Sequence, residues 1–550
     1  MKTCFILTLY TALLLFSSCK ENLSITTENK KIPRPIDWNN EIIYHVMPRS
    51  FFDSNGDLHG DLRGFVQQLD YLKELGVTTI LFTPLYESDF YHNYFPINYK
   101  NIDPEYGTMD DYMYFIGEVH KRGLKFLMDM ETQYAQSGNI WFDDSYKNTA
   151  SKFSDFIYYR DSLNHYPEQI FMKPNSPLRE FNLWPNKKKN IVLLNLKNQK
   201  IKDYMMDFYA FWVDPNQDGN FEDGVDGFRI DHIMDDLDYK GIFTNMYTEF
   251  WKPIFQKCKD INPSLFILGE QSNWNHDGKE MVEKSGADAA FNFPLHFAFK
   301  GRKGVQDMYT PTETEGVVLW PKRIHEVVLA SMKNFNGPPY TINFLENHDT
   351  DRWASIVNQN EGQLRMGAVL NLLLPGIPSL YYGQELGLTG VKGDYGSDAN
   401  HIPVREAFPW TPEVSAPGNA LWYKETGPWW DNALWNSDAL DLLNLNAQQI
   451  DSSSLWHQYK KLINIRTTYK HVIAQNYTPL HTDVPEIVAF KQTLDNHSLI
   501  VIVNASPKTV TLKQQQYEVI HQYNTSSFDH SLTLAPYGFM IAQSSEKENR

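Results

Sequence analysis

Cysteine is scarce in this chain of 550 residues, which contains only three. Cys4 and Cys19 lie near the start of the chain, and Cys258 is the single cysteine beyond them. One cysteine in the body of the chain cannot form an intramolecular disulfide, so a disulfide-stapled scaffold is excluded. The rigidity of the fold must therefore come from a large apolar core or from bound metal ions.

An excess of basic charge is also lacking, because 50 lysine and arginine residues stand against 67 aspartate and glutamate residues, for a formal net charge of −17. Such an acidic chain repels phosphate backbones, which argues against a nucleic-acid partner. Nothing in this balance opposes a neutral polymer. Aromatic residues make up 14% of the chain. Their rings could stack on sugar faces, although core packing would absorb many of them.

Long hydrophobic runs are confined to the N-terminus. The apolar run from Phe5 to Phe16 is too short for an ordinary membrane span, and with Lys2 before it, it predicts an export signal. The segment Phe16-Ser17-Ser18-Cys19 resembles a bacterial lipoprotein cleavage box, with Phe16 where leucine is usual. We therefore expect a signal peptide over residues 1–18, a lipid on Cys19 and a tether over residues 19–36; a plain secretory signal is the alternative. The lipid alone would anchor the exported protein to a membrane, facing the periplasm or the cell surface.

Short β-rich runs alternate with amphipathic stretches between about Glu41 and Tyr382. The eight runs are Ile42–Met47, Thr78–Phe82, Leu124–Met130, Val225–Ile230, Leu265–Gly269, Ala287–Phe293, Thr341–Leu345 and Ile377–Tyr382. Helical patterns separate them, for example over 64–75 and 196–212. Eight parallel strands with helices between them predict an α/β fold of the (β/α)₈ barrel type.

Two further units are expected beside this barrel, which would itself span residues 37–130 and 196–468. An irregular insert over residues 131–195 follows the third run and should pack as a subdomain over the barrel mouth. After about Tyr469 the pattern changes to short alternating runs at 487–491, 498–504, 509–512 and 516–520. These runs predict a C-terminal antiparallel β-sandwich domain over residues 469–550.

Acidic side chains stand at the carboxyl ends of three of the barrel runs. Asp231 ends the fourth run, Glu270 ends the fifth, and Asp349 follows the seventh. Because the carboxyl ends of barrel strands meet at one mouth, these side chains should converge. Two carboxyl groups about 5–5.5 Å apart make a retaining glycosidase. The pattern predicts Asp231 as nucleophile, Glu270 as general acid/base and Asp349 as the carboxylate that stabilises the charge of the transition state.

The neighbours of Asp231 lead to three more expectations. Arg229 lies two residues earlier on the same strand face and should keep Asp231 ionised by lowering its pKa. Glu270 has to stay protonated near neutral pH, so burial or nearby negative charge should raise its pKa. His232 follows the nucleophile and should point away from it by strand alternation, which favours a structural role.

These segments resemble the α-amylase family, glycoside hydrolase family 13, over nearly the whole chain after the tether. Its nucleophile, acid/base and stabiliser segments are similar to Gly227–Asp231, Leu268–Gln271 and Asn347–Asp349. Tyr91–Tyr94 resembles the family loop whose last tyrosine stacks under the sugar that is cleaved. Tyr382–Gly387 and Phe408–Trp410 fit the end of the family barrel and the segment after it. The resemblance implies retaining hydrolysis of α-1,4-glucosidic bonds in starch, maltodextrin or related α-glucans.

The resemblance also implies which residues bind the sugar. Tyr94 would stack under it and His348 would bind a hydroxyl group. His92 would contact the sugar or hydrogen-bond within its own loop. Arg229 and Arg352 complete the expected substrate-binding residues. Arg352 would act by ordering the loop that carries Asp349; a purely structural ion pair is the alternative.

Departures from the family pattern bear on specificity. The third strand usually reads Asp-x-x-x-Asn-His, whereas this chain has Asp129-Met130-Glu131-Thr132-Gln133-Tyr134. The missing Asn puts the common interdomain calcium in doubt. The missing His removes one usual sugar contact, for which Glu131 or Gln133 could compensate. The acidic residue Asp235, four positions after the nucleophile, resembles the neopullulanase and maltodextrin-hydrolase branch more than typical α-amylases. Exo-acting α-glucosidases carry an Asp where this chain has Tyr91, which favours an open, endo-capable groove.

Three alternatives stay open. One is a neopullulanase or cyclomaltodextrinase type of hydrolase, and another is a transglycosylase that uses the same covalent intermediate. A glucan-binding protein without catalysis is disfavoured because all three carboxylates are kept. Other glucan-utilisation proteins of the cell envelope are the expected protein partners.

Two acidic loops carry oxygen ligands at alternate positions, as calcium loops do. In the first loop Ca²⁺ would be bound by the side chains of Asp53, Asn55, Asp57 and Asp61 and by the backbone carbonyl of His59. In the second, which has Gly219 at the turn but no Glu at the twelfth position, the candidates are Asp214, Asn216, Asp218, Asn220 and Glu222. A solvated acidic turn is the alternative for each.

Overall fold

The computed structural model describes residues 37–169, 178–305, 319–335, 341–473, 476–513, 517–528 and 530–544, which all lie in one compact unit. The expected signal peptide, Cys19 and the tether lie outside the described residues. Within them, no helix combines the length and the apolar character that a membrane span requires. The free Cys258 is buried in helix α6 (Lys252–Ile261).

Eight parallel strands close into a barrel in the order β1-β14-β13-β12-β11-β10-β5-β2. The strands are β1 (Ile43–Val46), β2 (Thr79–Phe82), β5 (Lys125–Met130), β10 (Gly227–Ile233), β11 (Phe266–Gln271), β12 (Ala289–Phe291), β13 (Thr341–Phe344) and β14 (Ile377–Tyr381). Each falls on one of the eight runs expected from the sequence, so the predicted barrel is confirmed.

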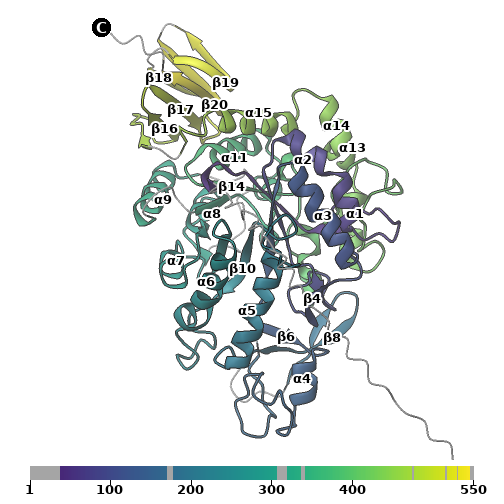
Figure 1. Cartoon of the computed structure of the whole chain (residues 1–550). Helices are drawn as coiled ribbons and strands as arrows, with labels where there is room; N and C mark the ends of the chain where they lie inside the picture. Colours follow the sequence, from purple (N-terminus) through teal and green to yellow (C-terminus); the bar gives the residue numbers. More distant parts are fainter. Residues whose placement is uncertain are drawn as a thin grey trace, which may run out of the picture. The chain divides into compact units, whose positions relative to one another are not determined.

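Helices surround the barrel on its outside (Figure 1). They are α1 (Leu62–Gln67), α2 (Leu69–Leu75), α3 (Met109–Lys121), α5 (Gln199–Val213), α6, α7 (Lys279–Ser285), α8 (Phe293–Phe299), α9 (Pro321–Asn334), α10 (Trp353–Ile356), α11 (Glu361–Leu373) and α15 (Leu455–Thr468). The helix expected over 64–75 is interrupted at Gln68, where the backbone leaves the helical region (φ −105°, ψ 4°).

Strand alternation explains both the barrel core and the position of the acidic residues. Leu127 of β5 and Leu268 of β11 point into the barrel and belong to its interior apolar cluster. Two residues further along the same strands, Asp129 and Glu270 point to the same side at the carboxyl ends. Gly227 of β10 leaves the space for this packing, because a Cβ there would lie 2.7 Å from a methyl group of Leu127.

The connections at the carboxyl ends of β2 and β5 carry small sheets. A hairpin of β3 (Tyr86–Glu87) and β4 (Asn98–Ile102) follows β2. The segment after β5 holds β6 (Tyr134–Gln136), α4 (Ile140–Ser145), β7 (Phe181–Leu183), β8 (Lys187–Lys189) and β9 (Ile191–Leu193), in which β6 pairs with β9 and β7 with β8. Three short α-helices and three 3-10 helices lie between β14 and α15: α12 (Pro428–Asp431), α13 (Leu440–Leu443), α14 (Leu445–Ile450), η5 (Gln384–Leu386), η6 (Asp398–Val404) and η7 (Leu434–Asn436).

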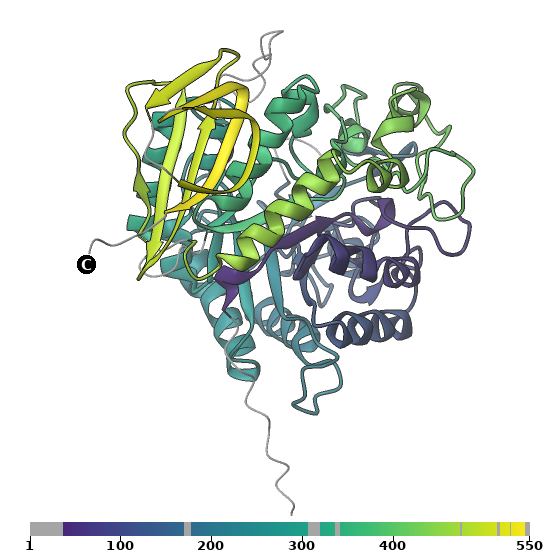
Figure 2. The same ribbon diagram turned by 90° about the horizontal axis from the view of Figure 1, so that it is seen from above.

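The C-terminal strands form one antiparallel sheet that packs beside α11 and α15 (Figure 2). Its strands are β15 (Thr478–Pro479), β16 (Ile487–Leu494), β17 (His497–Asn504), β18 (Val510–Lys513), β19 (Tyr517–Phe528) and β20 (Ser531–Ser544). Phe490 and Phe539 join the core shared with the barrel helices, whereas Ile502 and Met540 belong to a second apolar cluster on the other face. The expected antiparallel C-terminal domain is therefore present, with apolar residues buried on both faces of its sheet.

Candidate active site

The side chain of Arg229, on strand β10, lies at the centre of the acidic cluster. It is 1% exposed, and its Nη1 donates to both oxygens of Asp129 and to Oδ1 of Asp231, each at 2.8 Å. Its Nη2 donates to Oε2 of Glu270. One planar guanidinium therefore binds the predicted nucleophile and the predicted acid/base at once, which brings the two carboxyl groups into one site.

The two carboxyl groups differ in their affinity for a proton. Burial by itself raises the pKa of Asp231, but His232 and Arg229 outweigh burial and hold that pKa at about 2. Burial also raises the pKa of Glu270, and there Arg229 offsets it only in part, so the pKa lies at about 7. Below about pH 7, Asp231 is therefore ionised while Glu270 keeps its proton, as a nucleophile and a general acid require.

Trp274 orients the other oxygen of Glu270. Its Nε1 donates to Oε1 at 3.0 Å, and its ring stacks on Phe293 at a centroid distance of 4.4 Å. Each oxygen of Glu270 therefore has a donor, which sets the orientation of the carboxyl group.

Asp349 follows strand β13 and lies between two positively polarised groups. Nε2 of His348 is 3.1 Å from its Oδ2, and Nη2 of Arg405 is 2.9 Å from its Oδ1. Burial alone raises the pKa of Asp349, but His348 and Arg405 outweigh burial and lower the pKa well below its usual range. Asp349 is therefore a carboxylate at neutral pH and can stabilise positive charge that develops on a sugar.

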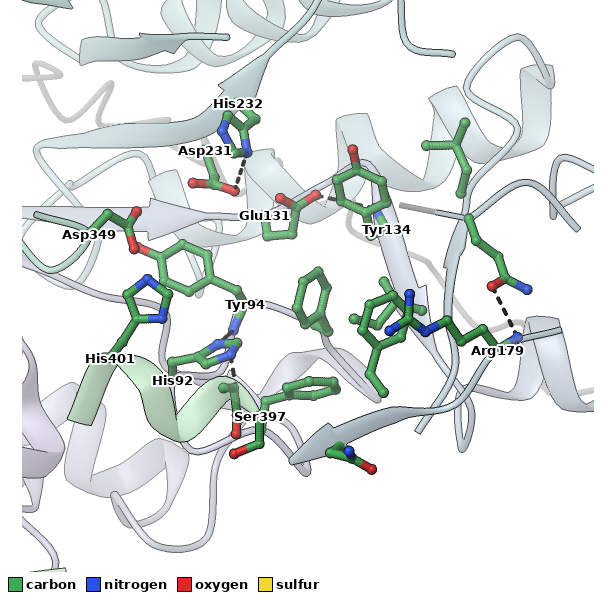
Figure 3. A pocket seen from close by; sticks show the side chains of 18 of the residues that line it. His92, Tyr94, Glu131, Tyr134, Arg179, Asp231, His232, Asp349, Ser397 and His401 are labelled. Carbon is green, nitrogen blue, oxygen red and sulfur yellow. Dashed lines mark hydrogen bonds and ion pairs between the residues drawn. The ribbon is translucent and has the colours of Figure 1, made fainter. Parts of the chain in front are cut away.

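A pocket of about 920 Å³ adjoins these groups, and Asp231, Asp349, Tyr94 and His92 line it together (Figure 3). The hydroxyl group of Tyr94 donates to Oδ2 of Asp129 at 2.6 Å, which fixes the ring in the pocket wall. Nδ1 of His92 accepts the backbone N–H of Tyr94 at 3.2 Å. The structure therefore brings the expected stacking tyrosine and the expected sugar-binding histidine to the same cavity as two of the three carboxylates.

Other expected sugar contacts lie behind this wall. His348 is 1% exposed, and its ring stacks on Tyr94 at 5.3 Å rather than lining the pocket. Arg352 is equally buried; its Nη1 donates to Oε1 of Glu346 at 3.0 Å and to the carbonyl oxygen of Tyr382 at 2.6 Å. Arg352 does not line the pocket, and its hydrogen bonds tie the loop after β13, which carries Asp349, to the end of β14.

The expectation for His232 is wrong. Its side chain lines the pocket, and Nδ1 lies 3.5 Å from Oδ2 of Asp231 (Figure 3). The pairing of β10 with β11 shifts register between Ile230 and Ile233, and His232 has a φ of 39°. This bulge breaks the strand alternation and turns the imidazole toward the nucleophile. Burial alone lowers the pKa of His232, but Asp231 and Glu270 outweigh burial and raise it.

Sequence reasoning missed several residues of this pocket. Arg405 lines it, holds Asp349, and donates to the hydroxyl group of Tyr91 at 3.0 Å. Asp398 lines it too, with its Oδ2 3.8 Å from Nε2 of His92. Asp398 begins the short 3-10 helix η6 (Asp398–Val404) and Arg405 directly follows it, in a segment after β14 whose sequence has no periodic pattern to mark a side chain as inward-facing. Glu131, which the sequence suggested only as a substitute for a missing histidine, also lines the pocket, and its carboxyl group lies next to Asp231 (Figure 3).

The two acidic loops have the same hydrogen-bond pattern. In the first, Oδ2 of Asp53 accepts the N–H of Leu58, and Oδ1 of Asn55 accepts that of Asp57. In the second, Oδ2 of Asp214 accepts the N–H of Gly219, and Oδ1 of Asn216 accepts that of Asp218. These side chains therefore turn toward the inside of each loop. In the described part of the chain, however, no three histidine, cysteine, aspartate or glutamate side chains lie close enough together to hold a metal ion.

The acidic residues at the end of the second loop differ in burial. Glu222 is exposed. Oδ1 of Asp214 and Oδ1 of Asp223 are both buried and have no hydrogen-bond partner among the described residues. Burial and the neighbouring Asp214 raise the pKa of Asp223. In this loop Asp214 and Asp223 therefore each carry a buried oxygen without a protein partner among the described residues, whereas Glu222 is exposed.

Comparison with known proteins agrees with the geometry. The family model of the alpha-amylase catalytic domain matches residues 45–475. The chain is 27% identical over 522 residues to alpha-amylase 3 of Dictyoglomus thermophilum, covering 92% of this chain and 93% of that protein. It is 27% identical over 520 residues to probable oligo-1,6-glucosidase 3 of Bacillus subtilis strain 168, covering 85% and 90%.

Solved structures share the fold. The crystal structure of alpha-amylase from H. orenii superposes with a TM-score of 0.72 at 21% sequence identity, covering 92% of this chain and 100% of that one. With the family match over most of the chain and the predicted carboxylates gathered at the carboxyl ends of the barrel strands, this protein belongs to the α-amylase family of glycoside hydrolases, which act on α-glucans.

Proposed function

We propose that this enzyme hydrolyses α-1,4-glucosidic bonds in starch, maltodextrin or related α-glucans, is endo-capable, and retains the anomeric configuration. The observation that carries the proposal is the shared guanidinium of Arg229, which contacts Asp231 and Glu270 directly. Two carboxyl groups bound to one guanidinium are close enough for the short separation of a retaining pair.

The proposed mechanism gives each side chain one role in the first step. With the sugar on the ring of Tyr94, the ionised Asp231 attacks the anomeric carbon. Glu270 gives its proton to the glycosidic oxygen as the bond between carbon and oxygen breaks. Asp349 faces the positive charge that develops on the sugar ring. The products are a glycosyl ester of Asp231 and the shortened glucan.

In the second step Glu270, now ionised, takes a proton from a water molecule. The water oxygen attacks the anomeric carbon, the ester bond to Asp231 breaks, and the carboxylate is restored. A sugar hydroxyl in place of water would give transglycosylation through the same intermediate, which is why that alternative is kept.

The shape of the pocket supports an endo-capable site. Its volume of about 920 Å³ is at the upper end for ligand pockets, and its wall continues from Asp231 to Phe181 of strand β7. Tyr91 stands where exo-acting relatives would carry an aspartate. It is buried, stacks on Trp422 at 4.8 Å, and donates to the carbonyl oxygen of Asp398. It therefore offers no carboxylate to hold a terminal glucose.

Cleavage of α-1,6 bonds in addition is the second candidate, because one similar protein is named an oligo-1,6-glucosidase. The marker of the neopullulanase branch, Asp235, accepts the backbone N–H of Tyr247 at 3.0 Å and does not line the pocket. Its side chain therefore orders the segment before α6 and does not decide between the two linkages.

Product profiles test the proposed function. The purified protein is incubated with starch, pullulan, cyclodextrin, maltotriose and isomaltose, and the products are separated by chromatography. We expect maltooligosaccharides of mixed length from starch at early times. Panose from pullulan or opened cyclodextrin would place the enzyme in the neopullulanase type, and products longer than the substrate would show transglycosylation. Release of glucose alone from every substrate would contradict endo action.

The pH dependence of hydrolysis should reflect Glu270. Because its pKa is raised from the ordinary value to about 7, the acid is protonated below that pH and is lost above it. We expect kcat/KM to fall about tenfold per pH unit above about pH 7 and to hold on the acid side down to the unfolding of the protein, since the pKa of Asp231 is about 2. A profile that rises through pH 8 would contradict the assignment of Glu270 as the acid.

We further propose that the first acidic loop binds Ca²⁺. Carboxylate and amide oxygens of Asp53, Asn55, Asp57 and Asp61 are hard ligands that suit this ion, and each accepts a backbone N–H from within the loop. The catalytic steps above do not depend on it.

Chelation should then destabilise the protein. With EDTA we expect the melting temperature to fall by roughly 2–5 °C, because an ion bound only by the folded state is removed. The variant Asp57→Asn should melt lower without EDTA and respond less to it. Equal melting curves for the native protein with EDTA and with added Ca²⁺ would show that the loop holds no ion.

We also propose that the protein is an exported lipoprotein anchored through Cys19, working with other glucan-utilisation proteins of the cell envelope. The variant Cys19→Ala should move the protein from the membrane fraction to the soluble fraction. Fractionation and immunoblotting measure this, and unchanged partitioning would contradict lipid anchoring.

A further inference from the structure

Glu131 is a buried acid in the pocket wall to which the mechanism above gives no role. It follows strand β5, and its backbone is held by Tyr86, whose hydroxyl group accepts the N–H of Glu131 at 2.6 Å and donates to its carbonyl oxygen at 3.4 Å. The residue is fully buried, and its carboxyl group lies between Asp231 and Tyr134 in the pocket wall (Figure 3).

The two oxygens of Glu131 have different surroundings. Oε1 accepts the backbone N–H of Gln133 and that of Tyr134, the latter at 3.2 Å. Oε2 has no hydrogen-bond partner if the group is a carboxylate, and none of the described residues offers it a donor. It faces Asp231, which is itself an acceptor of hydrogen bonds. An unpaired buried carboxylate oxygen is costly, so this arrangement calls for a proton on Oε2.

The charges around the pair decide which acid holds that proton. Two carboxyl groups in contact cannot both be ionised. Asp231 has the side chains of Arg229 and His232 beside it. Among the described residues Glu131 has no such cation: the groups that face it are Asp231 itself and four neutral phenols, those of Tyr86, Tyr99, Tyr134 and Tyr209. Burial and Asp231 raise the pKa of Glu131 well above its usual range. Asp231 is therefore the ion and Glu131 is the neutral acid.

We propose that Glu131 is a positioning residue for the nucleophile: its neutral carboxyl group donates the Oε2 proton to the carboxylate of Asp231. This hydrogen bond, together with that of Arg229, sets the direction in which Asp231 faces the sugar. It also stabilises the carboxylate that leaves when the glycosyl ester is hydrolysed. The proposal rests on the proposed function, because it assigns Glu131 through the nucleophile.

Two variants separate this role from others. Glu131→Gln keeps an oxygen for the two backbone N–H groups and puts an N–H₂ donor in the place of the O–H. Glu131→Met has a similar length but no donor. We expect Gln to keep kcat within about threefold of the native enzyme. We expect Met to lower kcat by about 10- to 100-fold with little change in KM, the loss typical of a hydrogen bond to a charged group.

Each outcome has a definite meaning. If Glu131→Gln loses as much activity as Glu131→Met, Glu131 works as an anion and the proposal is overturned. If Glu131→Met is fully active, the hydrogen bond has no role. Circular dichroism and melting curves show whether Met folds; should it not, the Gln variant alone still decides between the neutral acid and the anion. If the native enzyme cleaves no glucan, the proposed function fails instead.

A second readout does not depend on activity. An infrared difference spectrum between the native protein and Glu131→Gln, taken at alkaline pH, should show the carbonyl stretch of a neutral carboxylic acid. At that pH Glu270 and Asp129, whose pKa values lie at about 7, are ionised and do not contribute. Absence of this band would show that Glu131 is ionised and would overturn the proposal.

Discussion

Asp231→Asn should remove nearly all turnover while leaving the fold intact. The amide cannot form the glycosyl ester, so the first chemical step is lost, and we expect kcat to fall by on the order of 10⁴-fold or more. Asn is nearly isosteric with Asp and keeps an oxygen that can accept a hydrogen bond from Arg229. In the native protein Nη1 of Arg229 lies 2.8 Å from Oδ1 of Asp231. Initial rates on maltoheptaose measure the effect.

The control for this variant is Asp110→Asn, which makes the same chemical change at an exposed position on helix α3. It should keep the native rate. Oligosaccharide binding to Asp231→Asn, measured by calorimetry, should stay within about tenfold of the native affinity, since the pocket wall of Tyr94 and His92 is unchanged. A variant that still turns over at more than a few per cent of the native rate would show that another group is the nucleophile.

Glu270→Gln should be the second most damaging change, and its effect should depend on the leaving group. General acid catalysis contributes typically about 10²- to 10⁴-fold, so glucan hydrolysis should fall within that range. An aryl α-glycoside with a strongly acidic phenol needs no proton to leave, and its first step should proceed at close to the native rate. The comparison of the two substrates measures the effect.

The second step then reveals the other half of the role of Glu270. Without a base to activate water, the ester of Asp231 should accumulate and give a burst of phenol. Azide, which needs no base, should restore turnover and yield the α-glycosyl azide, whose configuration shows retention. Equal losses on the aryl substrate and on glucan, without azide rescue, would mean that Glu270 is not the acid/base.

The barrel could be predicted from the sequence because each of its strands has a recognisable local pattern of apolar residues. Ile377–Tyr381 and Thr341–Phe344 are short apolar runs, and alternation within them follows from the geometry of a strand. The same regularity placed Asp231 and Glu270 at strand ends. The positions of these acids therefore followed from the fold prediction and needed no long-range information.

The remaining site residues depend on contacts that no local pattern encodes. His232 reaches the pocket only because β10 has a bulge, which depends on the pairing with β11. Arg405 reaches Asp349 from a position 56 residues away, directly after the short 3-10 helix η6. Arg352 follows Asp349 closely, yet its partner is the buried Glu346. Proximity in sequence was therefore a poor guide to which arginine contacts Asp349.

The guanidinium shared by Asp231 and Glu270 makes the proton affinity of Glu270 change during each turnover. Asp231 raises the pKa of Glu270 while it is an anion and Arg229 lowers it. Once Asp231 has become a neutral ester, it no longer repels the carboxylate of Glu270, and Arg229 contacts one anion fewer. The pKa of Glu270 therefore drops, and the group stays ionised to act as a base. Hydrolysis of the ester reverses this shift in pKa. The change between acid and base therefore follows from the formation and cleavage of the ester bond and needs no conformational change.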